Sequence, residues 1–258
     1  MDAEADREAA ASAAPGESAY RLRDAVFLLA AYIGAQLVAA LVYMMVLFWR
    51  FGTAQGAALM KTGDGLNRIV VVSCAACSLA VIAAFWRFAR RRGVTLRGFG
   101  FVWPARRWLW ITPVMFVAIQ GLLSLFSVIA GDEVARQGLE TMNGVRSSDP
   151  RWNVASAFLF VLVIPVLEEA IFRVVLFRAL ARRMPAIAAA CLSVAVFVAM
   201  HVQYTLAGGA VAVLMTAEVT LLGAALMWLY MKSGSIWPSV AVHVANNGFA
   251  LLSLLIGF

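Results

Sequence analysis

Acidic residues are scarce in this 258-residue chain, and their positions are informative. Asp and Glu together number 14, charged residues make up 14% of the chain, and hydrophobic residues make up 63%. All but three of the acids lie in a polar N-terminal stretch or in loops, and the exceptions are Glu168, Glu169 and Glu218. A soluble domain is nearer half apolar and a quarter charged. The composition therefore excludes an ordinary soluble protein and indicates a protein that crosses a membrane several times.

Several functional signatures are also missing. The chain has no H-E-x-x-H helix, and its C-x-x-C at 74–77 lacks the βαβ context of a redox motif, so we read it as two small apolar residues one turn apart. No internal repeat is visible, which counts against an inverted-repeat transporter. The net charge of +7 comes from arginines at the ends of apolar segments. That is the positive-inside pattern of membrane proteins, and it does not indicate a nucleic-acid partner.

The pattern predicts an all-α fold, a polytopic transmembrane bundle of about seven helices. Residues 1–20 are Ala-rich and acidic without apolar periodicity, so we expect a disordered cytosolic tail. Residues 21–258 are expected to form a single domain, with its functional core at about 153–258. Most of the apolar segments reach the ~20 residues that span ~30 Å of hydrocarbon. They lie near 25–49, 69–88, 108–130, 153–180, 186–206, 210–231 and 235–257.

Loop charges orient the predicted bundle. The linker at about 89–107 carries six arginines and no acid, whereas the linker at 131–151 carries four acids against three arginines. Arginines also follow the fourth helix, at positions 178, 182 and 183. Positive loops stay in the cytosol, so we expect a cytoplasmic N-terminus and an odd number of crossings.

Three ionisable residues are predicted to share one depth in the membrane. Both histidines of the chain, His201 and His243, lie in apolar helices, as does Glu168. Counted from the cytoplasmic helix ends at 1.5 Å per residue, they lie roughly 22, 12 and 18 Å deep. A charge at the bilayer centre costs about 2.5–3.5 kcal/mol on insertion scales, so it usually serves a function. A packing role would explain one buried histidine, but a shared depth for three such groups indicates a site.

Helical spacing separates the two glutamates. Glu169 and Arg173 are four residues apart with the acid first, which favours an ion pair. Glu168 points about 100° away and has no base nearby in sequence, so it is the candidate general base. His243 and Asn247 share a face and could both present N–H groups to a developing oxyanion. Phe197 shares a face with His201 and could pack beneath it.

These residues carry a family resemblance. EEAIFR at 168–173, FVAMH at 197–201 and HVANN at 243–247 resemble, in order, the three motifs of the CPBP intramembrane proteases, which include CAAX prenyl proteases and bacteriocin-processing or self-immunity proteins. The resemblance covers about 165–250. It implies hydrolysis of a peptide bond within the membrane: the residues matching Glu168 and His201 activate water, and those matching His243 and Asn247 stabilise the oxyanion. Glu169, Arg173 and Phe197 are then structural support.

Cofactors and competing functions complete the hypotheses. Zinc is possible, with Glu168, His201 and His243 as three ligands, but that would use up Glu168 as base, so we favour metal-free catalysis. The expected substrate is a membrane-anchored or hydrophobic peptide, prenylated or not, and the expected location is a bacterial inner (plasma) membrane.

The alternatives are a non-catalytic membrane partner or self-immunity protein, and a proton-coupled transporter using Glu168, His201 and Glu218. Glu218 matches no motif, and a hydrogen bond within the bundle is expected for it. No nucleic-acid partner is expected, and the sequence does not indicate an oligomeric state.

Overall fold

The structure, a computed structural model, describes residues 20–141 and 147–256, and these residues form helices and loops without a strand. The predicted all-α class is confirmed. The disordered-tail prediction concerns residues that are almost all outside the described part, except Tyr20, whose side chain is 1% exposed in the core. The elements are α2 (Leu22–Phe51), α3 (Thr53–Met60), α4 (Gly63–Arg92), α5 (Trp108–Ala130), α6 (Asp132–Thr141), α7 (Pro150–Ala157), η3 (Phe158–Val163), α8 (Ile164–Glu169), η4 (Ala170–Leu176), α9 (Phe177–Ala181), α10 (Ala186–Ala199), α11 (Val202–Thr205), α12 (Gly209–Ser233) and α13 (Trp237–Ile256).

Each predicted segment corresponds to helix in the structure, with one difference in a boundary and one in continuity. The second helix begins at Gly63, six residues earlier than predicted, because the Thr62 side chain caps it by accepting a hydrogen bond from Gly65 N at 3.0 Å. The fifth segment was predicted as one helix over 186–206, but α10 ends at Ala199 and α11 begins at Val202. The predicted break between the segments 186–206 and 210–231 is confirmed, because α11 ends at Thr205 and α12 begins at Gly209. Gly208 and Gly209 make this turn with positive φ angles, 76° and 54°.

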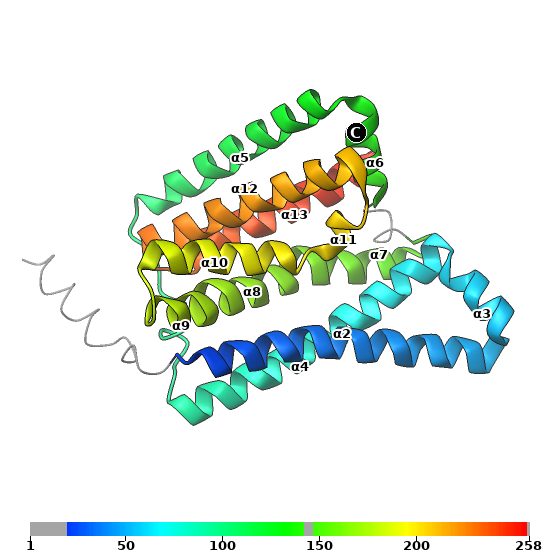
Figure 1. Cartoon of the computed structure of the whole chain (residues 1–258), viewed down its shortest axis with the longest axis horizontal. Coiled ribbons are helices and arrows are strands. Elements are labelled where there is room, and N and C mark those ends of the chain that lie inside the picture. Colours follow the sequence, from blue (N-terminus) through cyan, green and yellow to red (C-terminus); the bar gives the residue numbers. More distant parts are fainter. Residues whose placement is uncertain (1–19, 142–146, 257–258) are drawn as a thin grey trace, which may run out of the picture.

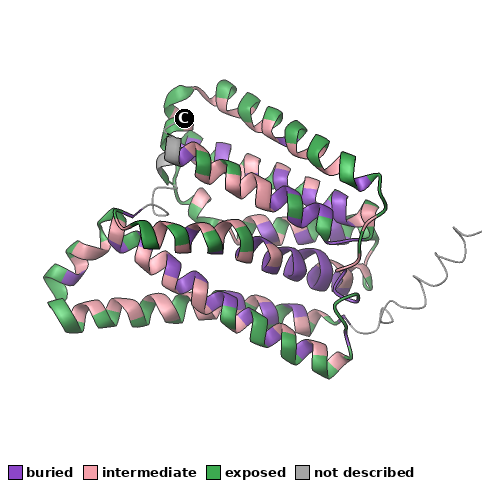
Figure 2. Cartoon of the chain, turned by 180° about the vertical axis from the view of Figure 1, so that it is seen from behind, coloured by how far each residue is buried: buried purple, intermediate pink, exposed green. Residues whose placement is uncertain are grey.

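The fourth segment is continuous helix but not continuous α-helix. Two π-helical stretches, η3 and η4, flank the α-helical piece α8, and α7 and α9 continue the helix on either side. π-helical insertions are rare and often accompany functional sites. This composite helix lies at the centre of the bundle, and every residue from 167 to 176 is buried (Figure 2).

The other helices surround this central helix. α2 and α4 pack against each other along one side of it, and α10, α12 and α13 cover the other side (Figure 1). α5 packs outside α12 and α13. The central helix therefore meets α2, α4, α10 and α13 directly, which brings residues distant in sequence to its buried face.

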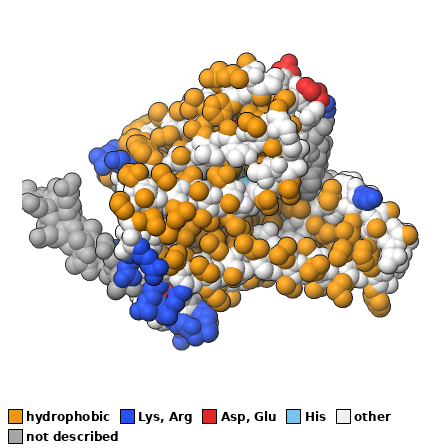
Figure 3. All heavy atoms as spheres, viewed as in Figure 1, with side chains coloured by type: hydrophobic (Ala, Val, Ile, Leu, Met, Phe, Trp, Pro, Cys, Tyr) orange, Lys and Arg blue, Asp and Glu red, His pale blue; other side chains and the backbone are white. Residues whose placement is uncertain are grey.

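The outer surface is that of a membrane protein. Four helices are long and apolar enough to cross a bilayer, Leu22–Phe51, Gly63–Arg92, Trp108–Ala130 and Gly209–Ser233, among the residues that the structure describes. Large hydrophobic side chains cover the face seen in Figure 3, and some are almost fully exposed, such as Trp49 at 87% and Trp103 at 84%. Such wide apolar exposure marks contact with lipid.

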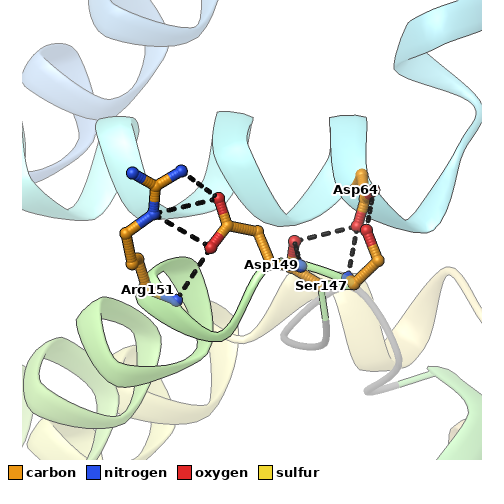
Figure 4. A network of polar contacts seen from close by, with 5 residues as sticks. Asp64, Ser147, Asp149 and Arg151 are labelled. Carbon is orange, nitrogen blue, oxygen red and sulfur yellow. Dashed lines mark hydrogen bonds and ion pairs between the residues drawn. The ribbon is translucent and has the colours of Figure 1, made fainter.

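The two ends of the bundle differ in charge. Lys and Arg side chains gather where α2 begins and α4 ends, and acidic side chains are visible at the opposite end (Figure 3). At that opposite end Asp64 ties the start of α4 to the loop before α7, because its Oδ1 accepts hydrogen bonds from the Ser147 hydroxyl at 2.8 Å and from Ser148 N at 2.6 Å (Figure 4). Asp149 caps α7, and its hydrogen bonds from Arg151 lower the pKa of the Asp149 carboxyl.

Candidate active site

Glu168 and Glu169 lie on α8 inside the bundle, 5% and 0% exposed. Arg173, 1% exposed, forms the predicted ion pair, with its Nη1 3.1 Å from Oε1 of Glu169. A buried guanidinium requires several partners. Arg173 also donates a hydrogen bond to the carbonyl oxygen of Gly223 at 3.3 Å, and its Cζ lies 4.4 Å above the ring of Phe197. The predicted pair is therefore confirmed, and α12 and α10 hold it in place.

His243 on α13 is 2% exposed and faces both glutamates. Its Nδ1 lies 2.9 Å from Oε1 of Glu169, and its Nε2 lies 3.7 Å from Oε2 of Glu168. Because Glu169 is the charged partner of Arg173, its oxygen accepts and the Nδ1 proton is donated to it. Glu169 thus sets the orientation and tautomer of His243, a link between the first and third motifs that the spacing of residues did not predict.

Tyr32 on α2 completes the surroundings of Glu168. This tyrosine is 7% exposed, and its hydroxyl donates a hydrogen bond of 2.7 Å to Oε1 of Glu168. Glu168 has no base nearby in sequence, as predicted, but it is not without a partner, because Tyr32 reaches it from a helix more than 130 residues away in sequence. The available signal was a hydroxyl in the middle of an apolar helix, but sequence alone does not say what it faces.

His201 lies at the break between α10 and α11, half-buried. Its backbone N bonds to the carbonyl of Val198 instead of that of Phe197, and its own Nδ1 lies 2.8 Å from the Phe197 carbonyl. A carbonyl oxygen can only accept, so Nδ1 carries the proton, and in the neutral ring Nε2 keeps its lone pair. The side chain thus replaces the helical hydrogen bond lost at the break and presents an unprotonated nitrogen.

Phe197 joins the two imidazoles. Its ring centroid is 4.7 Å from that of His201, as predicted from their spacing, and 6.0 Å from that of His243. His201 itself makes no hydrogen bond to Glu168 or His243 within the described part of the chain. The predicted convergence of three groups is therefore direct for Glu168 and His243, whereas His201 joins through the Phe197 ring. Gly223 allows this packing, because a Cβ there would lie 3.0 Å from Cδ1 of Phe197.

The side chain of Asn247 was predicted to present its N–H groups beside His243, but one of them is bonded to the backbone of η3. Its Nδ2 donates to the carbonyl oxygen of Phe160 in η3, at 2.9 Å. In a π-helix each backbone N–H donates to the carbonyl five residues earlier, as Ile164 N does to Leu159 O. The residue after Ile164 would therefore donate to Phe160 O. That residue is Pro165, which has no N–H. Asn247 supplies the missing donor, so only its second amide proton remains for the oxyanion role that the resemblance implies.

The donor set does not fit a zinc ion as arranged. Among residues 20–141 and 147–256, no three His, Cys, Asp or Glu side chains are grouped so that they could hold a metal. Glu168 and His243 lie together, but His201 is not grouped with them, although its Nδ1 hydrogen bond leaves Nε2 unprotonated. Glu218, half-buried on α12, hydrogen-bonds with Ser127 of α5. That agrees with the expected hydrogen bond within the bundle.

A comparison with known families finds a match over the part of the chain that carries the three motifs. Residues 150–249 match a family model described as type II CAAX prenyl endopeptidase, Rce1-like. The resemblance to CPBP proteases is confirmed. The matched stretch contains all three CPBP motifs, whereas Tyr32 lies outside it. No curated protein and no solved structure matches the chain. The CPBP match and the long apolar helices together support an integral membrane protease.

Proposed function

We propose that this protein is an intramembrane endopeptidase that hydrolyses a peptide bond in a membrane-anchored or hydrophobic protein, using water activated by Glu168 without a metal. One observation carries the proposal: Glu168 is held by Tyr32 on one oxygen while its other oxygen faces Nε2 of His243. An oriented carboxylate beside an imidazole that a second carboxylate fixes is the arrangement that general-base catalysis needs.

Charge balance suggests how the site works. Glu168 and Glu169 carry two negative charges, and Arg173 supplies one positive charge. A protonated His243 makes the cluster neutral, as a buried site requires. In that form Nδ1–H stays on Glu169 and Nε2–H is available to stabilise an oxyanion.

The hydrolytic steps then follow. Glu168 takes a proton from water, and the resulting hydroxide attacks the carbonyl carbon of the scissile bond, whose oxygen becomes an oxyanion on Nε2–H of His243. Glu168 returns the proton to the leaving nitrogen as the C–N bond breaks, giving a carboxyl group and an amine. His201 accepts a hydrogen bond from the water through its unprotonated Nε2. The second amide proton of Asn247 assists at the oxyanion.

Tyr32 is a positioning residue in this mechanism, because it acts through Glu168. Removing a hydrogen bond to a charged group costs about 1.5–3 kcal/mol, roughly a 10- to 150-fold loss in rate. Tyr32→Phe is expected to lower kcat in that range and to leave KM nearly unchanged. Because the hydrogen bond to Glu168 is buried, the melting temperature should also fall by several degrees. Tyr43→Phe on the same helix is the matched control and should retain wild-type kcat. A Tyr32→Phe enzyme with unchanged kcat, in which only KM rises or only the melting temperature falls, would contradict the positioning role.

The decisive test compares membrane proteomes of strains carrying wild type, Glu168→Gln and Glu218→Gln. Both substitutions remove one carboxylate from an apolar helix, but only Glu168 belongs to the proposed machinery. Uncleaved precursors should accumulate with Glu168→Gln alone. Normal cleavage by a stably inserted Glu168→Gln protein would refute the proposal, and a cellular phenotype preserved in that strain would favour the non-catalytic or self-immunity alternative.

Two further measurements refine the chemistry. Metal analysis of active purified protein should find less than stoichiometric zinc, and chelators should leave cleavage intact; stoichiometric zinc with loss on chelation would overturn the metal-free mechanism. The family description names a prenyl endopeptidase, so paired prenylated and unprenylated peptides of one sequence show whether the lipid group is recognised.

A further inference from the structure

A surface pocket lies at the arginine-rich end of the bundle, and its lining contains none of the motif residues. It has a volume of about 540 Å³ and lies between the start of α2 and the end of α9. Among the residues that the structure describes, its lining contains four arginines and no acid: Tyr20, Arg21, Leu22, Arg23, Ala179, Arg182 and Arg183. The positive-inside pattern explains arginines at helix ends, but it does not explain why four of them surround one concavity.

The walls of this pocket are fixed by hydrogen bonds that are buried or part-buried. The Tyr20 hydroxyl donates a hydrogen bond to the carbonyl oxygen of Gly98 and accepts one from Nη1 of Arg178 at 3.3 Å. Arg178 also donates to Gly98 O at 2.9 Å and to the Tyr230 hydroxyl at 2.6 Å. Across the pocket, Nη1 of Arg182 donates to the carbonyl oxygen of Tyr20 at 3.0 Å. The start of α2 and the end of α9 are therefore held together by hydrogen bonds, and the pocket does not depend on a ligand for its shape.

The charge around the pocket is positive and weakly compensated. Arg21, Arg23 and Arg183 are exposed. The adjacent acid, Asp24, already pairs with Arg92 at 2.9 Å. The first turn of α2 has no side-chain cap, so its N–H groups add positive potential at the same place. Guanidinium groups around a helix N-terminus match the geometry and charge of a phosphate.

The neighbouring surface indicates where such a phosphate comes from. Directly beyond the arginines, Val26 and Phe27 on α2 are 56% and 52% exposed. An amphiphile could therefore place an anionic head among the arginines and its acyl chain along α2. Basic pockets at the ends of transmembrane helices are suited to anionic lipid head groups. We propose that this pocket binds the phosphate of an anionic phospholipid.

The test uses full-length protein in detergent micelles, titrated with phosphatidylglycerol, phosphatidylcholine or inorganic phosphate, with binding followed by native mass spectrometry. The pocket variant is Arg21→Gln/Arg23→Gln/Arg183→Gln, which spares the Arg182 contact with Tyr20. The control variant is Arg87→Gln/Arg91→Gln/Arg97→Gln, which removes the same charge from exposed arginines outside the pocket.

Phosphatidylglycerol should bind wild type more tightly than phosphatidylcholine does. The pocket variant should lose on the order of 10- to 100-fold in phosphatidylglycerol affinity, since three arginines near an anionic head group are removed, while the control changes about twofold. Equal losses in both variants would mean general surface charge and would overturn the site. Inorganic phosphate binding as tightly as the lipid, with the same dependence on the pocket arginines, would overturn the lipid as its source. Melting temperatures near wild type for both variants keep these outcomes interpretable.

Discussion

Removing the positive charge of Arg173 would test the buried cluster most directly. Glu169 is 0% exposed, Arg173 is 1% exposed, and their closest atoms lie 3.1 Å apart. Breaking a buried ion pair from one side costs about 3–5 kcal/mol, because the remaining charge is left without its partner. Arg173→Leu also removes the hydrogen bond to Gly223 O and the contact with the Phe197 ring, each worth about 1 kcal/mol.

We therefore expect Arg173→Leu to lower the free energy of unfolding by about 4 kcal/mol or more. For a chain of this size that corresponds to a fall in melting temperature of roughly 8–16 °C. Thermal unfolding in detergent micelles, read from tryptophan fluorescence at fixed lipid content, measures it. Cleavage of a model substrate is measured on the same preparations at a temperature where both proteins are folded.

The double variant Glu169→Leu/Arg173→Leu separates stability from catalysis. Replacing a whole buried pair with apolar side chains is often neutral or stabilising, so the double variant should recover most of the lost stability. It should not recover activity, because His243 has lost the carboxylate that accepts its Nδ1 proton. A melting temperature for Arg173→Leu within about 2 °C of wild type would refute the reasoning on burial, and an active double variant would refute the role of Glu169 in holding His243.

The packing around the site gives three further predictions. Gly223→Ala should lower stability, because overpacking against the Phe197 ring costs about 1–3 kcal/mol and exceeds the gain of about 1 kcal/mol in helix propensity; Gly121→Ala, with open space around its Cβ, is the control and should not destabilise the protein in the same thermal assay. Asn247→Leu should cost about 1–3 kcal/mol in denaturant unfolding, because it leaves a carbonyl of the π-helical stretch η3 without a donor; an unchanged midpoint would contradict that role. Ser193→Ala should cost about 1 kcal/mol by the same measurement, since its hydroxyl donates 2.8 Å to a carbonyl oxygen of η4, and full stability of this variant would mean that the π turn does not depend on it.

Much of the architecture follows from composition and periodicity. Apolar runs of about 20 residues separated by charged linkers correctly predicted helix in each of the seven segments, because a hydrocarbon environment forces the backbone to satisfy its hydrogen bonds within each segment. They did not predict α3, α6 or the division of the fifth segment into α10 and α11. The i, i+4 rule correctly predicted the contacts of Arg173 with Glu169 and of Phe197 with His201. These are local relations, and helical geometry fixes them whatever surrounds the helix.

The irregular parts of the helices could not be predicted in that way. The π stretches around α8 depend on donors from other helices, as when Asn247 serves the carbonyl that Pro165 cannot. The break at His201 depends on its side chain taking over a backbone hydrogen bond. The average helical spacing does not account for such replaced hydrogen bonds. A prediction from sequence therefore gives a continuous α-helix at the π stretches and at the break.

The sequence by itself determined which groups are costly in lipid and on which helix each one lies, since hydrophobicity and charge belong to the residues themselves. Only the tertiary structure decided which of those groups meet. Tyr32 reaches Glu168 and His243 reaches Glu169 because α2 and α13 pack on opposite sides of the same central helix. The relative rotation of packed helices depends on the shapes of all their side chains together, and no single segment encodes it.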